Sequence, residues 1–246
     1  MQDVKAVLLV GGLGTRLRSV VSSAPKVLAA VGKGSFLELL LGQLRSQGIH
    51  RLVMCTGYLA DQIESQFGDG QAWGVSIEYS KEERPLGTAG AVKWAQKYLR
   101  DVPDFVVMNG DSFLELDFRK FIEFHRGHEG IATMAVLRVE DTGRYGTVLV
   151  DGNGRVRGFT EKTGSDAPGL VNGGVYIFNH AVLEYIPEQP ASLERDVFPR
   201  LLDHGVYAQE QHGMFIDIGT PSDYARAQQF FDRLSAASHA GHRAKP

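Results

Sequence analysis

The sequence has little cysteine, no long apolar run and no excess of charge of either sign. Its single cysteine, Cys55, excludes an internal disulfide, and its place in an apolar stretch favours a small buried residue over a catalytic nucleophile. No apolar run approaches the ~20 residues that a membrane span needs. The first residues show no secretory leader pattern. We therefore expect a cytoplasmic protein with no membrane partner.

The charges are nearly balanced, with 26 Lys and Arg against 29 Asp and Glu. No basic field predicts binding to nucleic acid. The 246 residues, 43% of them hydrophobic, suit one globular domain. We expect this domain over residues 1–235, in two halves at 1–112 and 113–235, followed by a disordered polar tail at 236–246. The oligomeric state, a homo-oligomer included, stays open.

Short apolar runs alternate with helical patterns in the first half. This alternation predicts an α/β fold with a Rossmann-like, mixed but mostly parallel central sheet and helices on both faces. Strands are expected at 6–10, 52–55, 75–79, 105–108, 132–139, 147–150, 156–160, 175–178 and 214–218. Helices are expected at 36–47, 60–67, 88–99, 118–128, 193–202 and 221–234.

A glycine-rich loop, residues 11–17, follows the first expected strand. Glycines let backbone N–H groups turn toward phosphates without a Cβ in the way. Arg16 can add a bidentate contact, and Lys26 is a second cation nearby. A dinucleotide-binding dehydrogenase is the rival interpretation, but it needs a third glycine where Leu17 stands and an acid near Ala30.

The loop, followed by Pro25 and Lys26, resembles the signature of the sugar-phosphate nucleotidyltransferases, which have a GT-A-like fold. Further matching motifs follow in order, so the resemblance covers residues 4 to about 230. It implies an enzyme that joins the nucleotidyl group of an NTP to a sugar 1-phosphate and releases pyrophosphate. The half at 1–112 would bind the nucleotide and the half at 113–235 the sugar.

The resemblance also assigns the nucleotide-binding residues. Arg16 would activate the pyrophosphate leaving group, and Lys26 would meet the α-phosphate. Glu82 lies near the expected base, where a carboxylate can accept from guanine N1–H and N2–H₂, although a solvated surface glutamate is the alternative. The nucleotide-binding candidates are Gly11, Gly12, Gly14, Thr15, Glu82, Pro85, Gly87 and Thr88.

Two acids, Asp111 and Asp217, each end an apolar strand. Ligands of open α/β sheets bind at the carboxyl ends of the strands. Mg²⁺ takes few protein oxygens and several from phosphate, so two carboxylates suit it. The family uses an aspartate in each of these motifs as a metal ligand. Asp111 and Asp217 are therefore the candidate Mg²⁺ pair, and a turn cap is the alternative for Asp111.

The remaining motifs resemble the acceptor site of the family. Lys162 is a point charge suited to the phosphate of the sugar. Glu161 and Asn172 can bond to sugar hydroxyls, although a surface ion pair and a β-turn are the structural alternatives. The acceptor candidates are Tyr145, Gly146, Glu161, Lys162, Asn172, Gly174 and Tyr176, and the catalytic candidates are Arg16, Lys26, Asp111 and Lys162.

Longer strings at 12–21, 83–91, 141–148 and 170–176 resemble the D-glycero-α-D-manno-heptose 1-phosphate guanylyltransferases. That implies GMP transfer from GTP to the heptose 1-phosphate, giving GDP-heptose for a lipopolysaccharide or capsule. The alternatives are mannose 1-phosphate with GTP, N-acetylmuramic acid 1-phosphate with UTP, and glucose 1-phosphate with dTTP or UTP. A non-catalytic nucleotide-sugar sensor predicts loss of the catalytic residues, but these are present.

Overall fold

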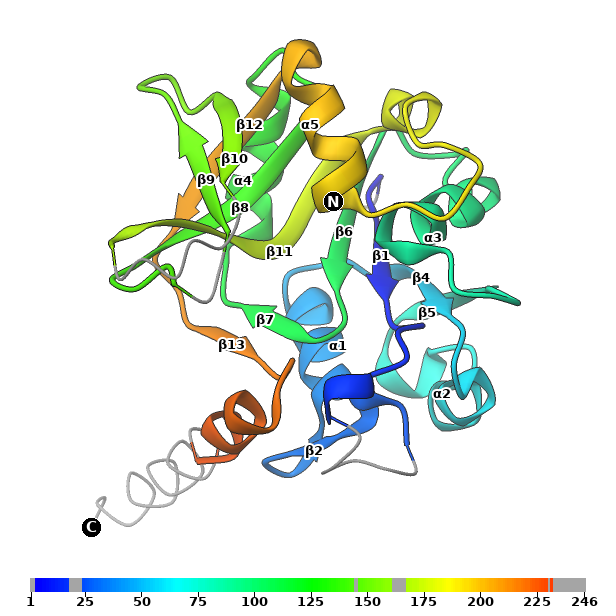
Figure 1. The fold of residues 1–246 in the computed structure, drawn as a ribbon. Coiled ribbons are helices and arrows are strands. Elements are labelled where there is room, and N and C mark those ends of the chain that lie inside the picture. The colour runs from blue at the N-terminus through cyan, green and yellow to red at the C-terminus, as the bar shows by residue number, and fades with distance from the viewer. Residues whose placement is uncertain (1–2, 18–23, 144–145, 161–166, 230, 232–246) are drawn as a thin grey trace, which may run out of the picture.

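The computed structural model describes residues 3–17, 24–143, 146–160, 167–229 and 231. One nine-stranded sheet runs through both halves, in the order β10-β9-β11-β6-β1-β4-β5, with β8 paired to β11 and β12 paired to β8 (Figure 1). Two small sheets, β13-β7 and β2-β3, accompany it.

The strands of the nine-stranded sheet are β1 (Lys5–Leu9), β4 (Arg51–Thr56), β5 (Ser76–Lys81), β6 (Asp104–Asn109), β8 (Ala132–Val139), β9 (Thr147–Val150), β10 (Val156–Thr160), β11 (Gly169–Asn179) and β12 (Val206–Gln211). The short strands are β2 (Ala30–Val31), β3 (Gly34–Ser35), β7 (Ser112–Leu114) and β13 (Phe215–Asp217). The α-helices are α1 (Phe36–Ser46), α2 (Ala60–Phe67), α3 (Gly87–Trp94), α4 (Phe118–Arg126) and α5 (Phe198–Leu201).

The strands that the first half contributes to the nine-stranded sheet are all parallel, as the alternation predicts. In the register of these strands, Leu9 of β1 stands beside Cys55 of β4 and beside Asn109 of β6. The strand β1 is buried along nearly its whole length because helices cover both faces of the sheet. The carboxyl ends of β1, β4 and β6 therefore meet at one edge.

The second half adds strands of the opposite direction. β11 is antiparallel to β6, β8 and β9, and β10 is antiparallel to β9. The other strands of the sheet share the direction of β1, so the predicted mixed, mostly parallel sheet is confirmed. The strand β11 is longer than the expected 175–178 because its polar, glycine-containing first part pairs with β8. The edge strand β12 was not expected, since it alternates only weakly (VYAQEQ).

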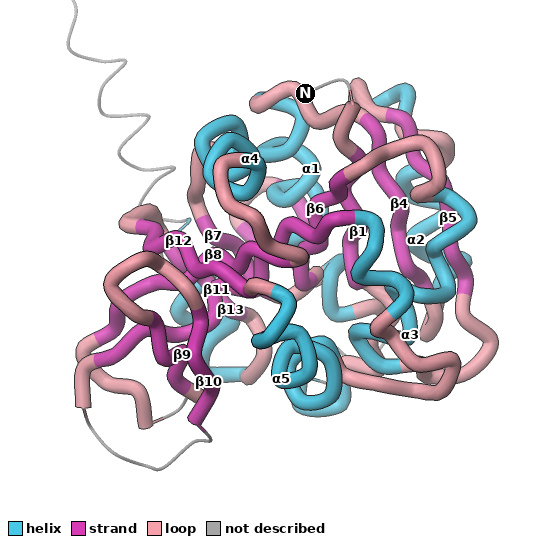
Figure 2. The backbone as a smooth tube through the Cα atoms, turned by 90° about the horizontal axis from the view of Figure 1, so that it is seen from above, coloured by secondary structure: helices cyan, strands magenta, loops and turns pink. Residues whose placement is uncertain are grey.

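Helices cover both faces of the sheet, as predicted (Figure 2). Apolar residues of α1, α2 and α4 pack in one core cluster, and those of α3 and α5 pack in the other. The Ser35 hydroxyl begins α1 by accepting from the Glu38 N–H over 3.3 Å. Asp117 begins α4 in the same way, by accepting from the Lys120 N–H over 3.1 Å.

Two helices are shorter than expected. The helix predicted at 88–99 ends as α3 at Trp94 and continues as a 3₁₀ turn, Ala95–Tyr98. The helix predicted at 193–202 is a π-helical turn, Leu193–Val197, followed by α5 and a 3₁₀ turn, Leu202–His204. Pro199 explains this division because it has no N–H for a continuous α-helical bond.

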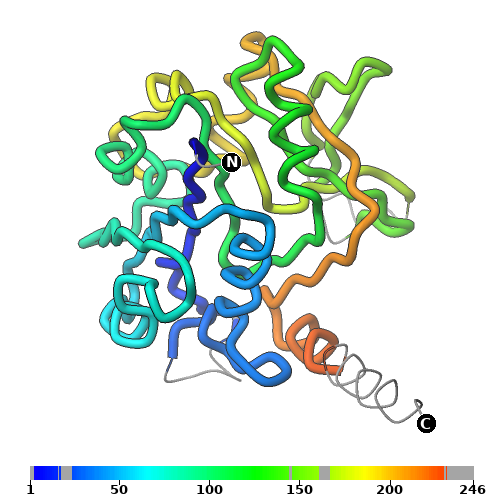
Figure 3. The backbone as a smooth tube through the Cα atoms, turned by 180° about the vertical axis from the view of Figure 1, so that it is seen from behind, coloured from blue at the N-terminus to red at the C-terminus, as the bar shows by residue number. Residues whose placement is uncertain are grey.

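The last described segment returns to the first half, as the orange segment in Figure 3 shows. β13 pairs antiparallel with β7 and sets Asp217 opposite Ser112. Residues 221–229 and 231 are helical, in agreement with the expected helix, and the predicted tail at 236–246 lies outside the described residues. This return brings Asp217 to the loop that follows β6.

Candidate functional site

The glycine-rich loop leaves β1 at the edge where the parallel strands end. The Val10 N–H donates to the Cys55 carbonyl over 3.0 Å, so the loop starts in line with β4. A Cβ at Gly11 would lie 3.0 Å from the backbone nitrogen of Gly57, and Gly14 has a φ of +57°. Glycine is needed at Gly11 by close approach and at Gly14 by backbone conformation.

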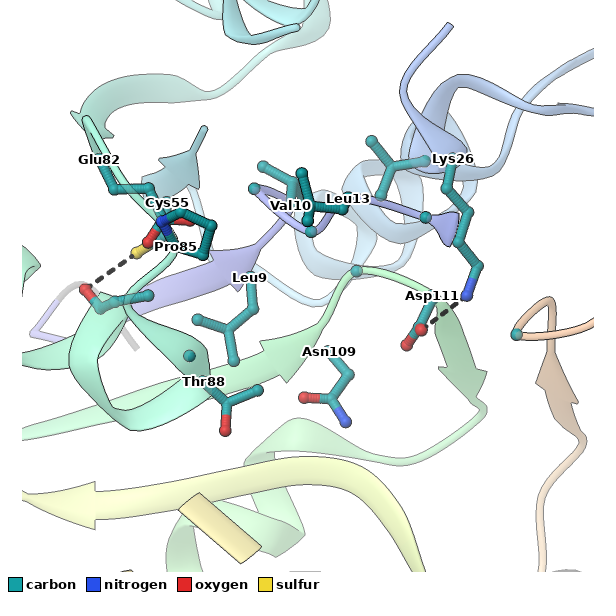
Figure 4. A pocket seen from close by; sticks show the side chains of 18 of the residues that line it. Leu9, Val10, Leu13, Lys26, Cys55, Glu82, Pro85, Thr88, Asn109 and Asp111 are labelled. Atoms are coloured by element: carbon teal, nitrogen blue, oxygen red, sulfur yellow. Dashed lines mark hydrogen bonds and ion pairs between the residues drawn. The ribbon is translucent and has the colours of Figure 1, made fainter. Parts of the chain in front are cut away.

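A cavity of about 440 Å³ is lined by this loop and by the carboxyl ends of β1, β4 and β6 (Figure 4). Its volume lies within the range of small-molecule sites, about 300–1,000 Å³. The sequence-predicted residues that line it are Gly11, Gly12, Gly14, Thr15, Lys26, Glu82, Pro85, Gly87, Thr88 and Asp111. All the predicted nucleotide-binding residues thus share one cavity.

Glu82 and Pro85 lie at one end of this cavity, beside Cys55 in Figure 4. A carboxylate oxygen of Glu82 accepts from the Leu86 N–H over 3.2 Å. Burial raises the pKa of Glu82, and the bond from Leu86 opposes that rise. A Cβ at Gly57 would lie only 2.8 Å from Glu82 Oε1, so the side chain packs closely on the backbone. Glu82 is therefore a half-buried, fixed acceptor rather than a freely solvated group.

The start of α3 is fixed to the segment that precedes α5. Gly87 has a φ of +73°, and a Cβ there would collide with the Ala191 carbonyl oxygen. That oxygen accepts from the Ala89 N–H over 2.9 Å. The Thr88 hydroxyl accepts from the Leu193 N–H over 2.7 Å. The cavity wall formed by Gly87 and Thr88 is consequently held from both halves of the chain.

Lys26 and Asp111 face each other at the other end of the cavity (Figure 4). Lys26 Nζ lies 2.7 Å from Asp111 Oδ2, with the lysine side chain 10% exposed and the aspartate side chain 39% exposed. Lys26 follows Pro25 in a 3₁₀ turn, Lys26–Leu28. Arg16 lies in another 3₁₀ turn, Thr15–Leu17, but its side chain lies outside what the structure describes.

Asp217 lies beside Asp111, although the two are far apart in the sequence. The Ile218 N–H donates to the Asp111 carbonyl over 2.9 Å. The pKa of Asp217 is raised, first by burial and then by the negative charge of Asp111. Gly219, two residues after Asp217, lines the cavity and donates its N–H to the Asp217 carboxylate. The two segments that carry the predicted pair therefore meet at the sheet edge, with Asp111 in the cavity lining and Asp217 in the wall of a second hollow, which Met214 also lines.

The two carboxylates fit a divalent cation that takes its other ligands from outside the protein. No group of three or more His, Cys, Asp or Glu side chains with metal-binding geometry occurs among the described residues. Asp111 already attracts a cation, the Lys26 ammonium. Two carboxylates that repel each other gain from a cation between them, and Mg²⁺ takes its remaining oxygens from phosphate and water. Asp111 and Asp217 could therefore hold Mg²⁺ together with oxygens of phosphate and water.

The predicted acceptor residues that the structure describes lie apart from the cavity lining. Asn172, Gly174 and Tyr176 belong to β11, and Gly146 directly precedes β9. Gly174 has a φ of +73°, and its N–H donates to Asn172 Oδ1 over 2.9 Å. The predicted residues Tyr145, Glu161 and Lys162 lie outside the described residues.

Tyr176 requires a correction. The sequence prediction gives it a contact with the sugar, but its side chain is fully buried in the core. Its hydroxyl accepts from Asn172 Nδ2 over 2.8 Å and donates to Glu194 Oε1 over 3.1 Å. Tyr176 therefore holds the Asn172 side chain through a hydrogen bond and does not present its own hydroxyl to a ligand.

Some lining residues were not among the predicted site residues. Asn109 and Cys55 line the cavity at the ends of β6 and β4, and the rule that ligands bind at strand ends could have indicated them. Burial raises the pKa of the Cys55 thiol, which agrees with a small buried residue and not with a nucleophile. Glu194, which bonds to Thr88, carries no sequence signal because its turn is irregular.

No helix among the described residues is long and apolar enough to cross a membrane.

Known proteins resemble this chain over nearly its whole length. The family model described as Nucleotidyl transferase matches residues 5–233. The D-glycero-alpha-D-manno-heptose 1-phosphate guanylyltransferase of Aneurinibacillus thermoaerophilus is 40% identical over 92% of this chain and 97% of its own length. The mannose-1-phosphate guanylyltransferase of Mycobacterium tuberculosis is 38% identical over 98% of this chain, which spans 68% of that protein.

The fold is also similar to a solved structure. The crystal structure of HddC from Yersinia pseudotuberculosis complexed with GMP-PN superposes with a TM-score of 0.82 and 35% sequence identity, over 92% of this chain and 99% of that one. The sheet and its helices therefore form the fold that the sequence resemblance implies.

Proposed function

The chain belongs to the nucleotidyl transferase family, and we propose that it transfers GMP from GTP to D-glycero-α-D-manno-heptose 1-phosphate, giving GDP-heptose and pyrophosphate. The observation that carries this choice is the 40% identity to the heptose 1-phosphate guanylyltransferase over 97% of that enzyme's length. Mannose 1-phosphate is the second candidate acceptor, favoured by the 38% identity to the mycobacterial mannose-1-phosphate guanylyltransferase.

The cavity supports a nucleotide as the first substrate. Backbone N–H groups of the glycine-rich loop surround the phosphates, and Arg16 neutralises the charge that develops on the departing pyrophosphate. Lys26, which bonds to Asp111 in the free protein, moves to the α-phosphate when the nucleotide enters. Positioning and charge neutralisation are the main demands of such a transfer.

Glu82 supports guanine as the base. Its half-buried carboxylate lies at the cavity end opposite Lys26 and Asp111, where the base would be placed if the phosphates lie near those two residues. A carboxylate has only acceptor oxygens, and these match the N1–H and N2–H₂ donors of guanine. Adenine and the pyrimidines do not present this pair of donors.

In the transfer step, an oxygen of the sugar phosphate attacks the α-phosphorus while the bond from that phosphorus to the bridging β-phosphate oxygen breaks. The attacking phosphate is already ionised at neutral pH, so no general base is needed. Lys162 holds this phosphate as a point charge. Asp111 and Asp217 would hold Mg²⁺, and the bound ion would offset the negative charge that the two phosphates bring together. Pyrophosphate leaves with the electrons of the broken bond.

The acceptor sugar lies on the β11 side of this centre. Asn172 and Glu161 bond to its hydroxyls, and Gly146 and Gly174 let the backbone approach the ring. Because GTP is an intracellular metabolite, the proposal places the reaction in the cytoplasm. GDP-heptose is an activated sugar donor, and its use would be a surface glycan such as lipopolysaccharide or capsule.

A product panel tests the proposal. The protein is incubated with Mg²⁺, each of GTP, ATP, UTP and dTTP, and each of heptose, mannose, glucose and N-acetylmuramic acid 1-phosphates. Mass spectrometry should find GDP-heptose as the most rapidly formed product, with pyrophosphate release that needs both substrates. Faster formation of GDP-mannose would select the second candidate. Absence of pyrophosphate release with every pair would favour a nucleotide-sugar sensor and contradict the proposal.

A further inference from the structure

One carboxylate links the two substrate sides of the molecule. Glu194, in the π-helical turn before α5, accepts from Thr88 Oγ1 at its Oε2 over 3.1 Å. At its Oε1 it accepts from the Tyr176 hydroxyl over 3.1 Å. Thr88 belongs to α3, at the cavity, and Tyr176 belongs to β11. The two oxygens of one side chain therefore join α3 to β11, two elements whose apolar residues also share one core cluster.

Each end of this connection continues into a candidate substrate contact. Thr88 lines the cavity and is fixed further by the Leu193 N–H. On the other side, the Tyr176 hydroxyl accepts from Asn172 Nδ2 over 2.8 Å, and Asn172 Oδ1 accepts from the Gly174 N–H over 2.9 Å. Both polar atoms of the Asn172 amide are thereby oriented. We call Thr88, Glu194, Tyr176 and Asn172 the Glu194 bridge.

Tyr176 is the buried centre of the bridge, and Thr88, Glu194 and Asn172 are only partly buried. Tyr176 is fully buried, so its hydroxyl has no water to replace a lost partner. Burial, and then the charge of Glu194, raise the pKa of Tyr176 and keep its hydroxyl protonated as a donor. Hydrogen bonds to an ionised acceptor are stronger than neutral ones. The bond between Tyr176 and Glu194 is therefore costly to break.

We propose that Glu194 is a positioning residue that couples the nucleotide side of the site to the acceptor side. The inference rests on the proposed function, since it assumes a nucleotide at Thr88 and a sugar phosphate near Asn172. A nucleotide that orders Thr88 also orders Glu194, Tyr176 and Asn172, so the acceptor then binds to a site that is already arranged. By linkage, the acceptor strengthens nucleotide binding by the same factor.

Calorimetric titration measures this coupling directly. The nucleotide probe is the α,β-methylene analogue of GTP, which cannot transfer GMP. The acceptor probe is the sugar 1-phosphate that the product panel selects. Its Kd is measured with and without saturating analogue, in the presence of Mg²⁺. For the wild-type protein we expect the analogue to lower the acceptor Kd by a factor of about 5–150, the usual range of such couplings.

Glu194→Gln should reduce this factor to near one. In a glutamine an NH₂ donor replaces one of the two carboxylate oxygens, so it cannot accept at both of the positions where Thr88 and Tyr176 donate. The matched control is Glu188→Gln, six residues earlier. Its carboxylate is 84% exposed and lies 3.4 Å from Lys93 Nζ in a surface ion pair. The control should keep the wild-type factor.

Tyr176→Phe is the second variant and keeps the ring in the core while removing the hydroxyl. It should also abolish the coupling and leave the Kd of the analogue alone within about twofold. A purely structural role would weaken both ligands equally and leave the factor unchanged, and that result would overturn the inference. So would a wild-type factor of one, or thermal melting that shows both variants to be unfolded. Failure of the proposed function looks different, since the wild-type protein would then bind no sugar phosphate in either condition.

Discussion

The two halves of the sheet place their candidate residues in different ways. In the first half, parallel strands end at one edge, and every predicted nucleotide-binding residue lines the cavity at that edge. In the second half, antiparallel strands distribute the described acceptor candidates along β11 and before β9, outside that lining. Asp111 and Asp217 lie at the seam, where β13 returns from the second half to pair with β7.

This difference suggests that the first half binds the nucleotide and the second half binds the acceptor. Substitutions in the first half should alter the kinetic constants for the nucleotide, and substitutions in the second half should alter the kinetic constants for the acceptor. Changes at the seam should affect both. Variants in each half and at the seam test whether the two binding roles are divided in this way.

The largest effect is expected at the seam. Asp111→Asn removes a carboxylate that would hold Mg²⁺ and should lower kcat by about a thousandfold or more, a loss typical of removing a central electrostatic group. Steady-state kinetics with both substrates varied would measure it. Near-normal kcat would show that the seam is not the centre of the reaction. Circular dichroism would check that the variant is folded.

Arg16→Ala, in the first half, should lower kcat by about 10²–10³-fold because the departing pyrophosphate loses a positive partner. The fold should be unchanged, since the surrounding loop is formed by backbone and glycines. Pyrophosphate release under saturating substrates gives the measurement. A variant that retains near-normal turnover would refute the assigned role of Arg16.

Lys162→Ala tests the second half. The loss of one charge-assisted bond should raise the KM for the sugar phosphate by about 10- to 100-fold. The KM for GTP should stay within about twofold, because one half of the site is untouched. An equal rise of both KM values would break the proposed division between the halves.

Glu82→Gln should reduce the preference for GTP over ATP by about tenfold, since one acceptor oxygen becomes a donor. The same preference should depend on pH. Burial raises the pKa of Glu82. As the solution is acidified, this side chain is therefore protonated at a higher pH than an ordinary glutamate. Competition kinetics with both nucleotides at a series of pH values would measure this. A preference independent of pH in the wild-type protein, and unchanged in the variant, would contradict base recognition by Glu82.

The smallest effect on activity is expected at Asp104, at the opposite end of β6 from the cavity. The His125 ring, whose Nε2 lies 3.7 Å from Asp104 Oδ1, and then the hydrogen bond from Arg126 lower the pKa of Asp104. A lowered pKa means that this carboxylate stabilises the fold at neutral pH and stops doing so as the pH falls below its ordinary value of 3.8. Asp104→Asn should cost about 1–3 kcal/mol at pH 7.

Urea unfolding from pH 7 to pH 3 would check this, with the difference between variant and wild type shrinking at the acid end. Both KM values should be unchanged. An altered KM would mean that the end of β6 away from the cavity also takes part in the site.

Much of the structure of the first half can be predicted from the sequence because the patterns that indicate it lie within short stretches of the chain. Continuous apolar strands such as β1 indicate parallel pairing, and parallel pairing brings strand ends together without knowledge of the register. The helix α2 begins and ends at the expected residues, Ala60 and Phe67. Asp111 could be placed at the edge by the same rule.

The second half depends on contacts between distant segments. The sequence does not reveal that the hydroxyl of Tyr176 is turned into the core, because this follows from the pairing of β11 with both β6 and β8. It also does not reveal Glu194 as the partner of Thr88, 106 positions away, since the π-helical turn that orients it has no regular pattern.

The most direct test is a crystal of the protein with Mn²⁺ and the α,β-methylene analogue of GTP, measured at a wavelength where manganese scatters anomalously. The expected result is an anomalous peak between the carboxylates of Asp111 and Asp217 and beside the α-phosphate, with the Lys26 ammonium no longer on Asp111. A bound analogue whose manganese lies away from both carboxylates would contradict it.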